Sequence, residues 1–182
     1  MIPAQALTIR NSLGGPLRVL DCNVNVTTPS AAVGPAVQRL PFRAIWDTGA
    51  SVSVITQNVI AGLSLAPTGK TNVETANGPR LSDVFLVDIE LPNGVRMQNV
   101  TVTEGIIRGF DVLIGMDIIT VGDFSITNLR GETVMSFRTP SVKEIDYVKE
   151  IEEQNRLRST TRDERRAAQK AAIKQQKRGR RP

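Results

Sequence analysis

The sequence predicts an all-β domain followed by a charged tail that is helical or disordered. Of the 182 residues, 40% are hydrophobic but only 4% are aromatic, so the core depends on Val, Ile and Leu, which favour strands. Charge divides the chain unevenly. Residues 1–140 hold 10 Lys and Arg against 11 Asp and Glu, whereas residues 141–182 hold 13 against 7. We therefore expect a β domain over 1–140 and a basic tail over 141–182.

The elements of the β domain are read from apolar alternation and from Pro, Gly and Asn at the turns. Those of the first third are strands over 7–10, 17–27, 38–46 and 51–55, a loop over 28–37 and a short helix or turn over 56–61. The later ones are strands over 84–91, 95–104, 112–114 and 133–137, a strand at Ile126, turns at 92–94 and 128–131, and a short helix over 116–121.

A polar hairpin is predicted between residues 67 and 83. Its Asn77-Gly78 pair is a strong turn signal, because both residues tolerate positive φ. Few large apolar groups occur there, so we expect a hairpin that opens and closes easily. The alternative to a hairpin with a functional role is an ordinary surface hairpin.

The tail begins with an apolar stripe, in which Val142, Ile145, Val148 and Ile151 recur every three residues. This spacing predicts a helix that docks on the body or on a partner helix. Residues 169–182 then contain six Lys or Arg and no acid. They are either a solvated, partly disordered terminus or a weak electrostatic contact for nucleic acid or another polyanion.

Several classes of protein are disfavoured by composition. The single cysteine, Cys22, excludes an intramolecular disulfide, fits a reducing compartment, and is interpreted as a small apolar residue on a strand. The absence of His makes a zinc site or a Ser-His-Asp hydrolase very unfavourable. Residues 1–15 show no signal peptide, and no apolar run has the length needed to span a bilayer. We expect a cytoplasmic protein without membrane contact.

One carboxylate, Asp47, lies between two apolar runs in the stretch from Ala44 to Ile55. A buried ionised carboxylate must be paired, hydrogen-bonded or protonated. Thr48 supplies a hydroxyl, and Gly49 lets the backbone turn tightly with its N–H groups facing inward. A plain strand-to-turn junction is the alternative, since Asp, Thr and Gly are all common in turns.

The flanks of this motif resemble the retropepsin-like aspartic proteases over roughly residues 15–138. The family signature is two apolar residues and Asp-Thr-Gly-Ala, followed far downstream by two apolar residues, a glycine and a short helix. The matching segments here are Ile45–Ala50 and Val112–Ile119. The resemblance implies a closed β-barrel of the acid-protease type with one short helix.

The resemblance also implies an aspartic endopeptidase that cleaves an extended polypeptide without a cofactor or metal. Because the chain has one Asp-Thr-Gly, it implies a homodimer in which two Asp47 carboxylates share a proton and activate water. The resemblance implies that Thr48 forms an intersubunit hydrogen bond and that Gly49 and Ala50 complete the active-site turn. Ile114 and Gly115 are implied to support that turn. The flap over the substrate is implied to consist of Thr75, Ala76, Asn77 and Gly78.

Two departures from viral retropepsins concern the dimer. Those proteins often pair an Asp, two residues after the first motif's glycine, with an Arg after the second glycine, but here these positions are Ser51 and Met116. Viral chain ends also interleave into an intersubunit sheet, whereas here residues 141–182 follow the last strand. We expect a dimer seam of different construction.

Two other functions compete with the protease. One is a catalytically silent retropepsin-fold dimer that binds partners or, through its tail, nucleic acid. The other is an unrelated strand-rich nucleic-acid-binding protein with a basic arm, which leaves the second motif unexplained. The intact Asp47, Thr48 and Gly49 favour the protease.

Overall fold

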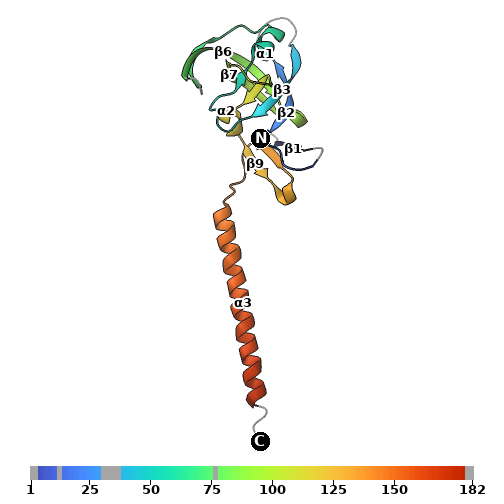
Figure 1. The fold of residues 1–182 in the computed structure, drawn as a ribbon, viewed down its shortest axis with the longest axis vertical. Helices are drawn as coiled ribbons and strands as arrows, with labels where there is room; N and C mark the ends of the chain where they lie inside the picture. Colours follow the sequence, from blue (N-terminus) through green and yellow to red (C-terminus); the bar gives the residue numbers. More distant parts are fainter. Residues whose placement is uncertain (1–3, 12–13, 30–37, 76–77, 179–182) are drawn as a thin grey trace. The chain divides into compact units, whose positions relative to one another are not determined.

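The structure, a computed structural model, describes residues 4–11, 14–29, 38–75 and 78–178. The chain divides into two compact units, residues 1–143 and residues 144–182. The first unit is mostly β-sheet with a few short helices, which confirms the predicted strand-rich fold. The second contains the helix α3, Tyr147–Arg178 (Figure 1). The assignment of residues 1–140 and 141–182 to two domains stays a prediction.

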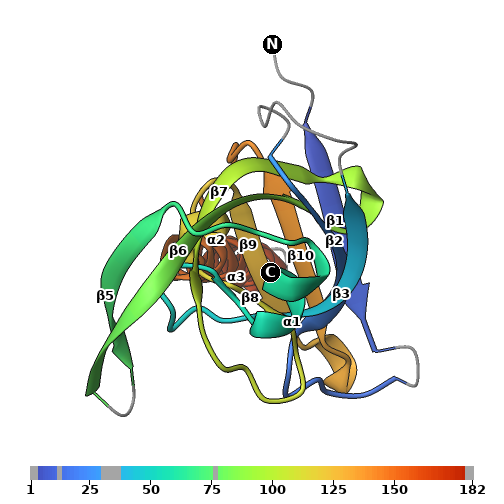
Figure 2. The same cartoon turned by 90° about the horizontal axis from the view of Figure 1, so that it is seen from above.

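Among the described residues, seven strands of the first unit form one sheet (Figure 2). In spatial order they are β2 (Asp21–Thr27), β3 (Arg39–Trp46), β8 (Val112–Ile114), β4 (Val54–Ile55), β7 (Arg96–Glu104), β6 (Gly78–Glu90) and β5 (Gly69–Thr75). The first strand also pairs antiparallel with β6, with Val26 opposite Ile89. β2 is therefore hydrogen-bonded to strands that lie far apart in the sheet order.

A second sheet joins the two ends of the β unit (Figure 2). Its described strands are β1 (Gln5–Arg10), β10 (Val134–Thr139) and β9 (Asp123–Thr127), antiparallel and in that order. Leu7 lies opposite Phe137, which in turn lies opposite Phe124. The chain's first strand is thus paired with its own β10.

The short helices are α1 (Gln57–Gly62), α2 (Met116–Ile119) and the 3₁₀ turns η1 (Pro92–Gly94) and η2 (Leu129–Gly131). Residues 57–62 adopt the helical alternative, so the described β unit has two short α-helices where the family resemblance implied one. The turn at η1 has positive φ at Asn93 (60°) and Gly94 (71°), as expected of an Asn-Gly pair.

Three predicted elements are shorter in the structure. The strand expected from residue 17 begins at Asp21, and the one expected from residue 51 begins at Val54. The helix expected to reach residue 121 ends at Ile119. The delay before Val54 has a clear cause, because the backbone N–H of Ser53 is used by the Asp117 carboxylate instead of by a neighbouring strand.

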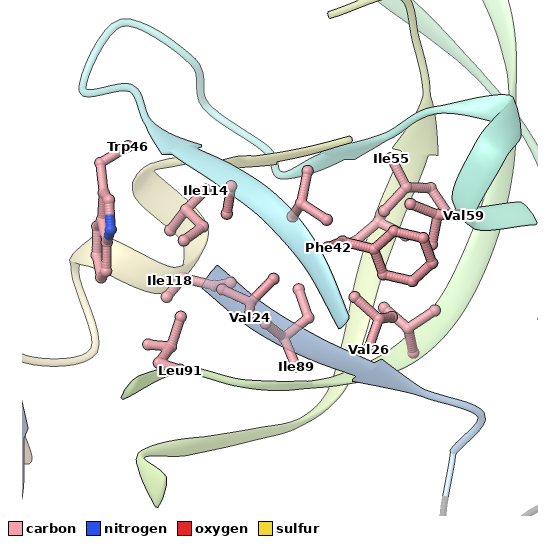
Figure 3. Close-up of a cluster of buried hydrophobic side chains, with 14 of the residues drawn as sticks. Val24, Val26, Phe42, Trp46, Ile55, Val59, Ile89, Leu91, Ile114 and Ile118 are labelled. Carbon is pink, nitrogen blue, oxygen red and sulfur yellow. The ribbon is translucent and has the colours of Figure 1, made fainter. Parts of the chain in front are cut away.

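The core is made mainly of Val, Ile and Leu, as the composition predicts. Figure 3 shows side chains of β2, β3 and β6 pointing toward one another, with Trp46 at one end of the cluster. The indole of Trp46 stacks on Phe124, with ring centroids 5.6 Å apart, and is tilted against Phe137 at 5.4 Å. Because those two phenylalanines belong to β9 and β10, this tryptophan joins the two sheets.

The predicted hairpin is formed by β5 and β6, which pair from Gly69 opposite Val84 to Thr75 opposite Gly78. It extends away from the other strands in Figure 2. Of the four predicted flap residues, Ala76 and Asn77 lie outside the described residues. Thr75 ends β5 and Gly78, with φ of 99°, begins β6.

The start of the tail differs from the prediction. Val142 and Ile145 precede α3, so the apolar stripe is helical only at Val148 and Ile151. The helix begins at Tyr147 because the Asp146 carboxylate accepts hydrogen bonds from the backbone N–H groups of Val148 (3.0 Å) and Lys149 (3.2 Å). Docking of the stripe on the body or on a partner helix stays a prediction. No helix in the described part of the chain is both long enough and apolar enough to cross a membrane.

Candidate active site

The Asp47 turn lies where two arms of the large sheet meet. β3 ends at Trp46, residues 47–50 form a turn closed by a hydrogen bond from the Ala50 N–H to the Asp47 carbonyl (3.3 Å), and the chain returns through β4. Between these arms lies β8, parallel to β3 and antiparallel to β4. The turn is therefore held on both sides by the buried strand that carries the second motif.

Two hydrogen bonds fix Asp47 itself. Its backbone N–H donates to the Ile114 carbonyl (3.0 Å), and its carboxylate Oδ1 accepts from the Gly49 N–H (2.8 Å). The side chain is half-buried, while Thr48 and Gly49 are exposed on the turn. A Cβ at Gly49 would lie 3.2 Å from that same Oδ1, so glycine allows the close approach of backbone and carboxylate. Within the described ranges no cation forms an ion pair with this carboxylate, which is oriented by the Gly49 N–H.

Gly115 permits the closest contact behind the turn. A Cβ at this position would lie 2.7 Å from the carbonyl carbon of Val52 and 3.0 Å from the carbonyl oxygen of Ala50. That same Ala50 oxygen accepts a hydrogen bond from the Met116 N–H (2.8 Å). Ile114, fully buried, precedes the glycine. Both residues of the second motif therefore lie directly against the Asp47 loop.

A buried polar link, which sequence reasoning missed, ties the loop to α2. The Ser53 hydroxyl is fully buried, donates to Asp117 Oδ1 (2.8 Å) and accepts from the Gly115 N–H (3.1 Å). The second oxygen, Asp117 Oδ2, accepts from the Ser53 N–H (2.9 Å). Its signals in the sequence were a serine between two valines and an acid two residues after the motif glycine.

This link joins the same two segments, the Asp47 loop and α2, that carry the positions of the ion pair of viral retropepsins. Ser51, at the first position of that pair, is exposed, and Met116, at the second, is half-buried. The connection is instead made two residues later on the loop and one residue later on the helix. A neutral hydroxyl and a carboxylate therefore replace a pair of opposite charges.

Asp47 opens onto a cleft of about 620 Å³. One wall comes from the β5–β6 hairpin, including Val73, Glu74 and Gly78, and another from the end of β7 and the loop after it. Ile106 in that loop is 90% exposed, so a large apolar side chain faces solvent at the cleft. The predicted active-site turn and Gly78 of the predicted flap thus line one cavity.

Cys22 lies on β2, as expected of a small apolar residue on a strand, and is half-buried there. Its sulfur accepts a hydrogen bond from the indole N–H of Trp46 (3.4 Å). Burial raises the pKa of the Cys22 thiol to about 11, against a smaller lowering by that hydrogen bond. In the described ranges, no group of three or more His, Cys, Asp or Glu side chains is placed to hold a metal ion.

Comparison with known families gives a match over more than half of the chain. The model of a family described as aspartyl protease matches residues 13–118, a range that contains both the Asp47 turn and the Gly115 motif. The chain belongs to the aspartyl protease family. This membership confirms the family predicted from the two motifs. No curated protein matches the chain.

Two solved structures are similar to this aspartyl protease family member. One is a retropepsin-like aspartic protease from Rickettsia conorii, with 15% sequence identity, 75% of this chain and 96% of that chain covered, and a TM-score of 0.47. The other is the solution structure of the Simian Foamy Virus (mac) protease, with 14% identity, 53% and 89% covered, and a TM-score of 0.34.

Proposed function

We propose that the protein is a homodimeric aspartic endopeptidase in which each protomer supplies one Asp47 to a shared active site. The observation that carries the proposal is the Asp47 carboxylate, oriented by the Gly49 N–H at a cleft that the β5–β6 hairpin also lines. Family membership supports the same chemistry. The sequence has one Asp-Thr-Gly, so the second carboxylate must come from another chain.

In this proposal the two Asp47 carboxylates share one proton, because like charges a few Å apart cannot both ionise cheaply. The ionised carboxylate takes a proton from a water molecule, which attacks the scissile carbonyl. The protonated one polarises the carbonyl oxygen, and a proton later reaches the leaving amine. Thr48, exposed on the turn, is proposed to bond to the partner's turn.

The substrate is proposed to be an extended polypeptide segment lying between Asp47 and the hairpin. An extended chain can add backbone hydrogen bonds to strand edges, as a further strand would. In the same proposal Thr75, Ala76, Asn77 and Gly78 form the flap, and the β2–β6 pairing closes the large sheet into a barrel.

The test replaces Asp47 with Asn, which keeps the side-chain volume but removes the acid. We expect the variant to keep the unfolding temperature and the solution mass of the wild type while cleavage of an unfolded protein substrate falls by about 10²–10⁴-fold or more. A statine-type transition-state mimic should inhibit the wild type. Asp21→Asn is the matched control, since that carboxylate forms a surface ion pair with Arg43 (2.8 Å).

Undiminished cleavage by Asp47→Asn, or full activity in a preparation that is monomeric by light scattering, would overturn the proposal. A well-folded dimer that binds peptides without cleaving them at any pH from acid to neutral would establish the alternative, a catalytically silent binding module. Contact of residues 169–182 with nucleic acid or another polyanion, and a cytoplasmic location, stay predictions from the sequence.

A further inference from the structure

One face of the β5–β6 hairpin forms a wall of the active-site cleft. Alternate residues of a strand lie on the same face of a sheet. On β6 the residues Gly78, Arg80 and Ser82 share one face, and all three line the cleft. Val73, which lies opposite Arg80 on β5, lines the cleft as well. Strand register and cleft lining therefore agree that Arg80 lies on the face of the hairpin that is turned toward the cleft.

Arg80 carries a positive charge that no acid in the described part of the chain neutralises. The residue is exposed, and it takes part in none of the ion pairs between described residues. By contrast, Lys70 of the same hairpin is paired with Asp83 (2.6 Å). A guanidinium presents five N–H donors in a planar fork that matches a carboxylate. This wall of the cleft therefore offers a binding partner for an acid.

Two further acids border the cleft, but the strand register directs both away from Arg80. Glu74 lies opposite Pro79, so its side chain is on the other face of the hairpin. Glu104 is in register with Ile55, which is fully buried in the core. Its side chain is therefore on the core side of β7 and not on the cleft side. Among these charges, the Arg80 guanidinium is the one that the strands direct into the cleft.

Hydroxyl groups lie on the same face as Arg80. Ser82 follows it by two residues on β6 and is 4% exposed. Thr103 of β7 is also 4% exposed, lies opposite Val84 of β6, and lines the cleft. Its hydroxyl oxygen, Oγ1, is buried and has no hydrogen-bond partner among the described residues. Because a buried hydroxyl without a partner is costly, this wall suits a ligand that accepts hydrogen bonds better than an apolar one.

We propose that Arg80 selects substrates that carry an acidic side chain, Asp or Glu, close to the scissile bond. The inference rests on the proposed function and names the class of polypeptide that the enzyme cleaves. The substrate carboxylate accepts two hydrogen bonds from the guanidinium, the arrangement in which Arg binds carboxylates most strongly. Arg80 contacts a side chain of the substrate and not the reacting atoms, so it determines specificity and has no catalytic role.

The effect of this contact appears mainly in substrate binding. An exposed ion pair contributes little, because water screens it. When a substrate fills the cleft, water is displaced and the attraction between the two charges grows. Since the contact is the same in the bound substrate and in the transition state, its loss raises KM and leaves kcat nearly unchanged. If Arg80 merely stabilised the hairpin, its loss would instead lower kcat for every substrate alike.

The test uses peptides that span the fastest-cleaved bond of casein, an unfolded substrate. At each of the four positions on either side of that bond, one peptide carries Glu, one carries the neutral Gln and one carries Lys. Both sides are scanned because the two-fold axis places one Arg80 on each side. For the wild type we expect kcat/KM to be about tenfold higher with Glu than with Gln at one or more positions, through KM, and lower still with Lys. This preference should vanish in Arg80→Gln and reverse toward Lys in Arg80→Glu.

The matched control is Arg108→Gln. Arg108 is exposed in the loop after β7 and is not part of the cleft lining. Its loss therefore changes the net charge by the same amount as Arg80→Gln without removing the contact. We expect Arg108→Gln to keep the preference for Glu, and added salt to weaken that preference in the wild type. Unfolding curves and solution masses establish that each variant is folded and assembled like the wild type.

The outcomes separate the role of Arg80 from the proposed function. A wild type that cleaves casein but treats Glu, Gln and Lys alike at every position overturns the role of Arg80 and leaves the proposed function intact. A preference that survives in Arg80→Gln, or that is lost equally in Arg108→Gln, overturns it likewise. A folded wild type that cleaves neither casein nor any of the peptides, from acid to neutral pH, overturns the proposed function, and the substrate class with it.

Discussion

Replacing Ser53 with Ala should show how far the Asp47 loop depends on one buried hydroxyl. The change removes the hydrogen bond to Asp117 Oδ1 and leaves the Gly115 N–H without its acceptor. A buried unsatisfied donor costs about 1–3 kcal/mol, and a hydrogen bond to a charged group is worth about 1.5–3 kcal/mol. Since the two contributions overlap, we expect a loss of about 2–3 kcal/mol, or roughly 5–10 °C in Tm.

Activity should fall further than stability. The lost contacts hold the loop against α2, and a misplacement of about 1 Å at a catalytic group can reduce the rate about 100-fold. Stability is measured by urea unfolding, and activity by kcat on one peptide substrate at a temperature where both proteins are fully folded. Ser136→Ala is the control, because its hydroxyl bonds to Thr8 (3.0 Å) at an exposed position, where we expect a change within about 0.5 kcal/mol.

A double-mutant cycle with Asp117→Asn completes the test. If Ser53 and Asp117 act as one unit, the two losses should be non-additive by about 0.5–3 kcal/mol. The reasoning is refuted if the free energy of unfolding of Ser53→Ala lies within about 0.5 kcal/mol of the wild-type value and its kcat is unchanged. It is also refuted if the stability losses of Ser53→Ala and Asp117→Asn are strictly additive in the double variant.

Three further predictions follow from single contacts. Gly115→Ala should lower the free energy of unfolding by about 1–3 kcal/mol, because the added methyl must displace the backbone of Val52. It should also lower kcat more than the control Gly69→Ala, whose added methyl meets no atom within 4 Å, and equal kcat values for the two variants would contradict this prediction. Hydrogen bonds from Ser141, Val142 and Arg138 hold the pKa of Asp123 well below its usual range. The ionised Asp123 therefore stabilises the folded protein fully above about pH 4, and this contribution is lost as the pH falls toward the folded-state pKa. The unfolding midpoints of wild type and Asp123→Asn should therefore differ at pH 7 and converge toward pH 2, and a gap that stays constant contradicts this. Cys22, with its raised pKa, should react with a thiol reagent at pH 8 far more slowly in the folded protein than in urea; equal rates would show that burial does not protect it.

Much of the site could be predicted because its signals are local. Asp47, Thr48 and Gly49 are adjacent, and their turn follows from short-range chemistry between a carboxylate and a backbone N–H. Strands such as β6 and β7 show apolar alternation, and the turn between them has an Asn-Gly pair. Local patterns of this kind survive folding, because tertiary contacts reinforce them.

Other features depend on contacts between distant residues and were not predictable from pattern alone. Ser53 and Asp117 are 64 residues apart, and only the insertion of β8 between β3 and β4 brings them together. The prediction of a helix over the whole apolar stripe of the tail was wrong because of a local contact. Its spacing is helical from Val142 onward, but the Asp146 carboxylate caps the helix and starts it at Tyr147. A single capping group outweighed a weak periodicity.

Trp46 links the small sheet to the Asp47 turn. Its backbone N–H donates to the Leu20 carbonyl (2.9 Å), the next N–H, of Asp47, donates to the Ile114 carbonyl, and its indole stacks on Phe124 of β9. Because protein interiors are close-packed, a truncation at Phe124 should also disturb the Asp47 turn through these contacts. We therefore expect Phe124→Ala to lower cleavage as well as stability, and an unchanged kcat in the folded variant would contradict this.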